Sequence, residues 1–532
     1  MEKKTAYIYD TTLREGCQKT GIAFSMEDKL RILERIINDL GISMIEAGWP
    51  GSNPKDIEFF QRINQKEFTN VKIFPFGSTR RKNSKVEEDR SIKAIIETGT
   101  SYATIFGKTW DLHVKDALET TLEENLNMIS DTISYLIKNG IEVMFDAEHF
   151  FDGYKNNKEY AIKCLKAARD AGAKWIVLCD TNGGILPYEL REIVNDVKEK
   201  IKNIVLGIHA HNDSGLANAI ALEAWREGVD LIQGTMNGFG ERCGNTDLTA
   251  IIPILKLKMD VDCIEENKLK NLTEVSHFVY EMANLPGQPD QPFVGKNAFS
   301  HKGGIHISAM LKNLKTYEHI NPELIGNNRN IKVSELAGKS SILHMAEKFN
   351  IPLTETNPKV NAILRVIKEK ENQGYSFEGA EGTLEILMRG MDMNIQDPNY
   401  YRKKFFELEG FRVLTEMYKD NLISEATIKV KVEGQEYHTA AEGNGPVNAL
   451  DNALKKALVY FYPSIKEIKL SDFKVRIINQ AGTASKVRVL AETYDKQDSW
   501  GTIGAHGNII VASWDALVDS YIYKLLKNKE NW

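Results

Sequence analysis

The first half of the chain alternates short apolar runs with longer amphipathic segments, and the alternation repeats eight times. Apolar runs that predict strands lie near residues 5–10, 43–48, 71–77, 102–107, 141–147, 175–180, 204–210 and 231–236. Segments with helical periodicity lie near residues 26–40, 54–66, 87–98, 120–138, 157–171, 187–199, 214–227 and 245–257. Eight strand–helix units in about 250 residues predict an α/β fold, a closed (β/α)8 barrel.

Polar side chains follow the predicted strands, and they do so at the same end of each strand. In a (β/α)8 barrel, the active site is built from the loops at the carboxyl ends of the strands. In chain order the clusters are Arg14-Glu15, Glu46, Arg80-Arg81, Lys108, Asp146 to His149, Asp180 to Asn182, His209 with His211, and Gly240 to Arg242. The sequence therefore predicts one active site at this mouth of the barrel.

A metal site is expected at the seventh predicted strand. His209 and His211 are two residues apart, so both imidazoles point to the same face of the strand. Glu15 adds a carboxylate, and two histidines with one carboxylate leave coordination positions open for substrate. A single histidine or a lone Arg14-Glu15 ion pair would more often be structural, but the combination favours Zn²⁺, Mn²⁺ or Mg²⁺. Asn245 could supply a carbonyl oxygen as a fourth ligand, could be the N-cap of the next helix, or could have both roles.

Such a metal could chelate a 2-oxo acid and polarise its keto carbon. Arg14 could then donate to the oxygen on which negative charge develops, and the Thr181 hydroxyl could hold the substrate carboxylate. A strand-end cap is the alternative role for Thr181. Attack by a weak carbon acid requires a base, and the candidates are Glu148 or, from a Gly-rich turn beyond the barrel, His306 with Tyr317.

Composition excludes several classes of protein. A chain of 532 residues is too long for one hydrophobic core, so two or three domains are expected. The net charge of −6 gives no footprint for nucleic acid or an anionic membrane. No apolar run reaches the roughly 18 residues of a membrane span, and no signal peptide is recognisable. Five cysteines without Cys-x-x-Cys spacing fit the cytoplasm.

Beyond the barrel, expected at residues 1–285, the pattern changes twice. Prolines 286, 289 and 292 mark the end of the barrel, and residues 286–375 predict a helical linker with polar breaks at 326–328 and 356–358. From about residue 376 to 532 we expect a C-terminal α+β domain in which a helix follows every third strand.

This C-terminal segment contains an internal repeat with a spacing of 64 residues. Gly443-Asn444 and Gly507-Asn508 each precede an amphipathic helix, at 446–460 and 509–527. Two similar halves commonly form a ligand site or a dimer face between them. Because helix N-termini attract carboxylates, these four residues predict an amino-acid effector site, with plain helix capping as the alternative.

Three motifs together resemble those of a known enzyme family. Residues 10–16 (Asp-Thr-Thr-Leu-Arg-Glu-Gly), 209–213 (His-Ala-His-Asn-Asp) and 238–245 (Gly-Phe-Gly-Glu-Arg-Cys-Gly-Asn) resemble the barrel metalloenzymes that comprise 2-isopropylmalate, homocitrate and citramalate synthases. The resemblance extends to the C-terminal domain, which looks like that family's allosteric domain. Residues 48–56, 76–81, 104–111 and 146–154 look like the citramalate branch.

The resemblance implies a reaction and a set of roles. Acetyl-CoA, pyruvate and water would give citramalate and CoA, with isoleucine as feedback inhibitor and a homodimer as the assembly. The roles implied are metal binding by Glu15, His209 and His211, keto polarisation by Arg14, carboxylate binding by Thr181, and base function at Glu148 or at His306 with Tyr317. Glu15 departs from the Asp of many citramalate and isopropylmalate enzymes and matches homocitrate synthases.

The choice of substrate and reaction stays open on these residues alone. Aromatic residues near the strand ends (Trp49, Phe74, Phe106, Phe150 and Phe151) would crowd the pocket and favour a methyl keto acid, but discrimination is limited to about 1–3 kcal/mol per methylene. The same machinery could make 2-isopropylmalate or homocitrate. It could also cleave a carbon–carbon bond, as 3-hydroxy-3-methylglutaryl-CoA lyases do, or the barrel could serve as the scaffold of a catalytically silent amino-acid sensor.

Overall fold

The computed structural model describes residues 4–66, 68, 70–331, 338–418, 421–479 and 482–528. By its internal contacts, the chain divides into two compact units. The first comprises residues 1–299 and 320–328, and the second comprises residues 300–319 and 329–532.

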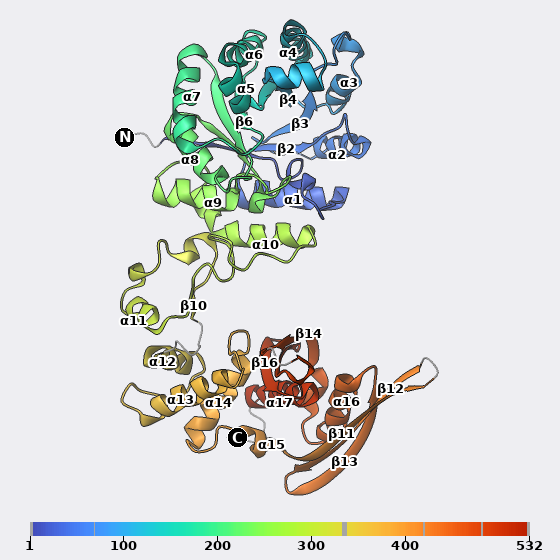
Figure 1. Cartoon of the computed structure of the whole chain (residues 1–532), viewed down its shortest axis with the longest axis vertical. Coiled ribbons are helices and arrows are strands. Elements are labelled where there is room, and N and C mark those ends of the chain that lie inside the picture. The colour runs from blue at the N-terminus through green and yellow to red at the C-terminus, as the bar shows by residue number, and fades with distance from the viewer. Residues whose placement is uncertain are drawn as a thin grey trace. The chain divides into compact units, whose positions relative to one another are not determined.

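The first unit is built on a closed barrel of eight parallel strands (Figure 1). Each strand pairs with the next in sequence, and β1 closes the barrel against β8 through Tyr7 with Leu231 and Asp10 with Gly234. This confirms the predicted (β/α)8 barrel. The strands are β1 (Tyr7–Asp10), β2 (Met44–Gly48), β3 (Lys72–Ser78), β4 (Tyr102–Lys108), β5 (Glu142–Glu148), β6 (Trp175–Asp180), β7 (Val205–Ala210) and β8 (Leu231–Gly234).

Helices surround these strands (Figure 1). They are α1 (Met26–Leu40), α2 (Pro54–Asn64), α3 (Arg90–Glu97), α4 (Leu122–Lys138), α5 (Phe150–Asn156), α6 (Lys158–Asp170), α7 (Pro187–Lys200), α8 (Ala217–Arg226), α9 (Leu248–Pro253) and α10 (Leu272–Met282). Their starts are set by local chemistry. At α1, for example, Ser25 accepts from the Asp28 N–H, and the Asp28 carboxylate accepts from the Ser25 N–H, which satisfies two donors at the helix end.

Two apolar layers hold the barrel together. The side chains that point outward from the strands pack against the helices in one large core. The side chains that point inward fill the barrel with a separate cluster: Tyr9, Met44, Phe74, Met144, Trp175, Val177, Cys179 and Leu231. This cluster fills the interior of the barrel, so the polar side chains of the barrel gather at the carboxyl ends of the strands.

The second unit begins with helices: α11 (Gly304–Lys312), α12 (Lys339–Lys348), α13 (Pro358–Asn372), α14 (Glu381–Met393) and α15 (Tyr400–Phe405). One of the expected breaks is a helix start, because Asn357 caps α13 and Pro358 occupies its first turn. A short parallel pair, β9 (Ser300–His301) and β10 (Asn330–Ile331), joins two of its segments.

The rest of the second unit repeats one motif twice. Strands β11 (Glu407–Tyr418), β12 (Asn421–Val432) and β13 (Gln435–Gly443) form an antiparallel sheet followed by α16 (Pro446–Leu458). Strands β14 (Lys469–Ile477), β15 (Val487–Tyr494) and β16 (Ser499–His506) form a second sheet followed by α17 (Ile509–Lys527). The predicted α+β repeat is present, but its first strand begins at Glu407 rather than near residue 376.

Helices α14 and α15 occupy the intervening residues. Thr383 on α14 donates to Asp519 on α17 with a distance of 2.8 Å, and Leu384 is buried, so tertiary packing stabilises a helix that Gly379, Gly382 and Gly390 obscure in the sequence.

Within the described residues, no helix combines the length and apolar character that a membrane crossing requires.

Candidate active site

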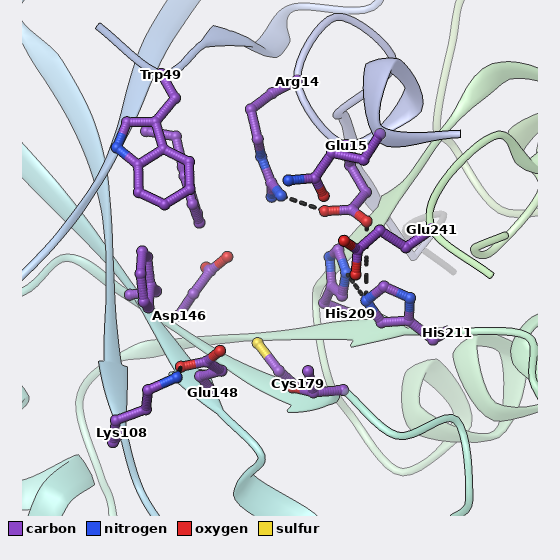
Figure 2. Close-up of a pocket in the computed structure, with 14 residues that line it drawn as sticks. Arg14, Glu15, Trp49, Lys108, Asp146, Glu148, Cys179, His209, His211 and Glu241 are labelled. Atoms are coloured by element: carbon purple, nitrogen blue, oxygen red, sulfur yellow. Dashed lines mark hydrogen bonds and ion pairs between the residues drawn. The ribbon is translucent and has the colours of Figure 1, made fainter. Parts of the chain in front are cut away.

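A cavity of about 230 Å³ lies at the carboxyl ends of the barrel strands. Figure 2 shows its side chains converging from several strands and the loops that follow them. The lining residues are Arg14, Glu15, Gln18, Trp49, Phe76, Phe106, Lys108, Asp146, Glu148, Cys179, Thr181, His209, His211 and Glu241. The pocket thus lies at the mouth of the barrel where the polar clusters predicted an active site.

Glu15, His209 and His211 form a compact cluster in this pocket (Figure 2). One ligand atom from each lies within 4.8 Å of the others, and all three side chains are buried. The two Nε2 atoms are 3.4 Å apart, and His211 Nε2 is 3.9 Å from Glu15 Oε1. The cluster has the donor set and the spacing of a site for one divalent cation.

The electrostatics of the cluster suit a cation. Burial acts to raise the pKa of Glu15, but the charges of Arg14 and the two imidazoles outweigh it and lower the pKa to about 2. Burial, followed by the neighbouring His209, lowers the pKa of His211 to about 3, and burial also lowers the pKa of His209. At neutral pH the cluster therefore offers a carboxylate and two neutral imidazoles, the forms that bind metal.

Asn245 lies beside this cluster. It pairs with His211 in an isolated β-bridge, and among the described residues neither Oδ1 nor Nδ2 of its buried amide has a hydrogen-bond partner. The preceding Gly244 has φ +91°, and a Cβ there would meet the Gly238 oxygen at 2.1 Å, so the turn requires glycine. The alternative that Asn245 caps the next helix is wrong, because Asp247 caps α9.

Arg14 is fixed from three sides. Its Nε donates to Glu46 Oε1 at 2.5 Å, its Nη1 donates to Glu15, and its guanidinium carbon lies 3.8 Å from the centre of the Phe76 ring. Glu46 is held in turn by the Tyr9 hydroxyl at 3.1 Å. The guanidinium is therefore pre-oriented beside the metal cluster before any substrate arrives.

Glu148 and Thr181 also line the pocket. Glu148 forms an ion pair with Lys108 at 2.5 Å, and both side chains line the cavity. The Thr181 hydroxyl accepts from the His149 N–H at 2.9 Å, which leaves its own proton available to a ligand. Thr181 thus has a structural partner and also faces the pocket.

An aromatic wall borders the cavity. The rings of Phe76 and Phe106 stack with centroids 5.2 Å apart, and Trp49 contacts both edge-on at 5.3 and 5.6 Å. The expectation that Phe74, Phe150 and Phe151 also crowd the pocket is wrong. Phe74 belongs to the barrel interior and the other two belong to the outer core, because their strand and helix positions point them away from the mouth.

His306 and Tyr317 are neighbours, as their predicted pairing requires. Their rings stack with centroids 4.2 Å apart, and both side chains are exposed. They belong to the second unit, whereas the metal cluster belongs to the first. Their role in catalysis therefore stays a prediction.

The four residues of the expected effector site differ in their local roles. Asn508 caps α17, because its side chain accepts from the N–H groups of Ile510 and Val511. Asn444 has no such role, since Gly445 occupies the N-cap position of α16 and the Asn444 N–H donates to Asn448. Gly443 ends β13 and Gly507 follows β16, so each pair does precede a helix. Capping explains one half of the repeat only.

Sequence reasoning missed Gln233, which contacts the cluster. Gln233 is a buried amide on β8, and its Oε1 lies 2.8 Å from His209 Nδ1. The signal was a lone amide in the apolar run Leu231-Ile232-Gln233, since a buried polar side chain requires a partner.

Comparisons with known proteins agree with the fold. Residues 5–279 match the HMGL-like family, residues 293–374 match the homocitrate synthase post-HMGL domain-like family, and residues 383–525 match the LeuA allosteric (dimerisation) domain. The first match spans the barrel and contains every residue that lines the pocket. The chain is therefore an enzyme of the HMGL-like barrel class, with a regulatory domain of the LeuA type.

Full-length relatives narrow the class. The chain is 53% identical to the (R)-citramalate synthase of Aquifex aeolicus and 53% identical to that of Geobacter sulfurreducens, in each case over 98% of both chains. It is 31% identical to the 2-isopropylmalate synthase of Methanocaldococcus jannaschii, over 98% of this chain and 95% of the relative. The chain belongs to the (R)-citramalate synthase family.

Proposed function

We propose that this enzyme condenses acetyl-CoA with pyruvate and hydrolyses the resulting thioester, so that its products are citramalate and CoA. The observation that supports this most is the convergence of Glu15, His209 and His211 in a pocket beside Arg14. The relatives named citramalate synthase are up to 53% identical to the chain, against 31% for the relative named 2-isopropylmalate synthase, which favours this member of the family over its neighbours.

The residues present fit a divalent cation. Glu15, His209 and His211 would hold it, and the orphaned buried amide of Asn245 could supply a further oxygen. When bound, the cation supplies Lewis-acid polarisation of the keto group. Two imidazoles with one carboxylate accept Zn²⁺, Mn²⁺ or Mg²⁺.

Arg14 orients the 2-oxo acid and stabilises charge that develops on its keto oxygen. Glu46 and Glu15 occupy Nε and Nη1, and among the described residues no hydrogen bond occupies Nη2. That N–H can therefore donate to substrate without reorganising the guanidinium. Thr181 offers its hydroxyl proton to the substrate carboxylate.

Glu148 is our candidate for the base among the carboxylates that line the pocket. Its carboxylate lines the cavity, and the ion pair with Lys108 holds it on a rigid strand end. It could remove a proton from the acetyl methyl group of acetyl-CoA. His306 with Tyr317 remains the alternative, and in that case a neighbouring subunit would complete the site.

Turnover on three 2-oxo acids tests the choice of substrate. We expect CoA release from acetyl-CoA to be fastest with pyruvate, and much slower with 2-oxoisovalerate or 2-oxoglutarate. Faster release with 2-oxoisovalerate would favour 2-isopropylmalate synthesis on the same site, and faster release with 2-oxoglutarate would favour homocitrate synthesis.

The aromatic wall predicts how selectivity can be changed. Replacing Phe106 by alanine removes the ring that stacks on Phe76 and opens space in the pocket. We expect the ratio of kcat/KM for 2-oxobutanoate to that for pyruvate to rise by about 10-fold, because one methylene contributes about 1–3 kcal/mol. The buried Phe145, which belongs to the outer core, gives the control variant Phe145→Leu, in which the ratio should not change.

The C-terminal domain is proposed to bind isoleucine and to mediate a homodimer. The match of residues 383–525 to an allosteric dimerisation domain supports this, together with the two similar sheet-and-helix halves. We expect isoleucine to lower CoA release by the full chain, with leucine as the matched control. Equal inhibition by both, or by neither, would contradict the assignment.

A further inference from the structure

We propose that Gln233 is a positioning residue for the metal centre, and that Asp146 fixes the orientation of its amide. Gln233 Oε1 lies 2.8 Å from His209 Nδ1, and Gln233 Nε2 donates to Asp146 Oδ1 at 3.1 Å. All three side chains are buried. This inference rests on the proposed metal centre and extends it by one layer of side chains.

The orientation of the Gln233 amide follows from its neighbours. Asp146 Oδ1 can accept a hydrogen bond whether or not the second carboxylate oxygen carries a proton, so the amide nitrogen faces Asp146. The sulfur of Met144, a second acceptor, lies 3.4 Å from the same nitrogen. The amide oxygen is thereby directed at His209.

The orientation of the amide decides which nitrogen of His209 can bind a metal. An amide oxygen can only accept, so His209 Nδ1 must carry the ring proton and donate it to Gln233. The ring is neutral in this tautomer, and its lone pair is then on Nε2, the atom that faces His211 Nε2 across 3.4 Å. The amide thus fixes both the tautomer and the rotation of the ring.

The burial of Asp146, Gln233 and His209, which together we call the relay, argues for this role. A buried glutamine is expensive unless its donors and acceptor are used, and an apolar side chain would suit the neighbouring Leu231 and Ile232 better. His211 has no equivalent support, since its Nδ1 is buried and has no hydrogen-bond partner among the described residues. His209 is therefore the imidazole of the pair that a neighbouring side chain orients.

Metal affinity tests the relay directly. The probe is Zn²⁺ alone, added to the metal-free full chain in competition with a chromophoric chelator. We expect Gln233→Met to weaken Zn²⁺ binding about 10- to 100-fold, the usual effect of losing such a partner. Thermal unfolding of the metal-free variants measures any general loss of stability.

Gln291 gives a matched control in the same unit. It is also a buried amide that donates to an aspartate, Asp247, at 3.0 Å and accepts from a side chain, the Tyr280 hydroxyl, at 2.9 Å. Gln291→Met therefore removes the same groups without touching the cluster. We expect its Zn²⁺ affinity to equal that of the wild type.

A rescue experiment separates positioning from packing. In the double variant Gln233→Glu with Asp146→Asn, the carboxylate and the amide exchange places. The new carboxylate still accepts from His209 Nδ1, and the new amide donates to this carboxylate. We therefore expect the double variant to bind Zn²⁺ at least about tenfold more tightly than Gln233→Met does. Unchanged affinity in Gln233→Met, or no recovery in the double variant, would overturn the relay. If the wild type binds no metal, the proposed centre fails together with the relay.

Discussion

Replacing His211 by alanine is expected to remove the bound divalent metal and to lower kcat/KM with pyruvate by about a thousandfold. The physical reason is the loss of one of only three charged or imidazole ligands in the cluster. Metal polarisation of a carbonyl contributes several kcal/mol, and about 4 kcal/mol corresponds to roughly a thousandfold in rate. The metal content of purified protein and the rate of CoA release are the two measurements.

The exposed His438 on β13 offers a control for this prediction. His438→Ala removes an imidazole from the second unit and should change neither metal content nor turnover. A His211→Ala variant that is folded, metal-free and still active would contradict the metal-dependent mechanism.

The second large effect is expected at Arg14. Arg14→Lys keeps the positive charge but loses the planar fork that binds Glu46, Glu15 and substrate together. We expect kcat to fall by about 10²–10³-fold, the usual consequence of losing one donor to developing negative charge. Steady-state kinetics with pyruvate measure this effect.

Arg14→Ala should also destabilise the fold. It leaves the fully buried Glu46 without its cation, and removing one partner of a buried ion pair costs about 3–5 kcal/mol. Thermal or denaturant unfolding of the metal-free protein measures the loss. Arg226→Lys, at an exposed ion pair with Glu223, is the control and should alter neither stability nor rate.

For the kinetic prediction, wild-type kinetics in Arg14→Lys would show that the guanidinium has no role in the reaction.

The barrel could be predicted from the sequence because its signals are local. A parallel strand covered on both faces is an unbroken apolar run, and each run here begins and ends within a few residues of the observed strand. The short helix α5 was not predicted, since it follows β5 almost directly. Only His149 separates the two elements, and its φ of +55° turns the chain in a way that the sequence does not reveal.

The candidate site could be predicted only in part. His209 and His211 share a face because of their spacing. Glu15 lies far from them in the sequence, and the closed barrel brings it to them. Gln233 could not be assigned, because its partner Asp146 is 87 residues away and only the closed barrel brings the two together. Asn245 was ambiguous for a related reason: Asp247, two residues further on, competes for the cap position.

Metal-dependent citramalate synthesis is tested by CoA release from acetyl-CoA and pyruvate by metal-free protein, before and after a divalent metal is restored. We predict no release above background without metal, full release after addition of Zn²⁺, Mn²⁺ or Mg²⁺, and citramalate as the carbon product by mass spectrometry. Equal release by the metal-free and the restored protein would contradict a metal-dependent reaction, and a product other than citramalate would contradict the proposed activity.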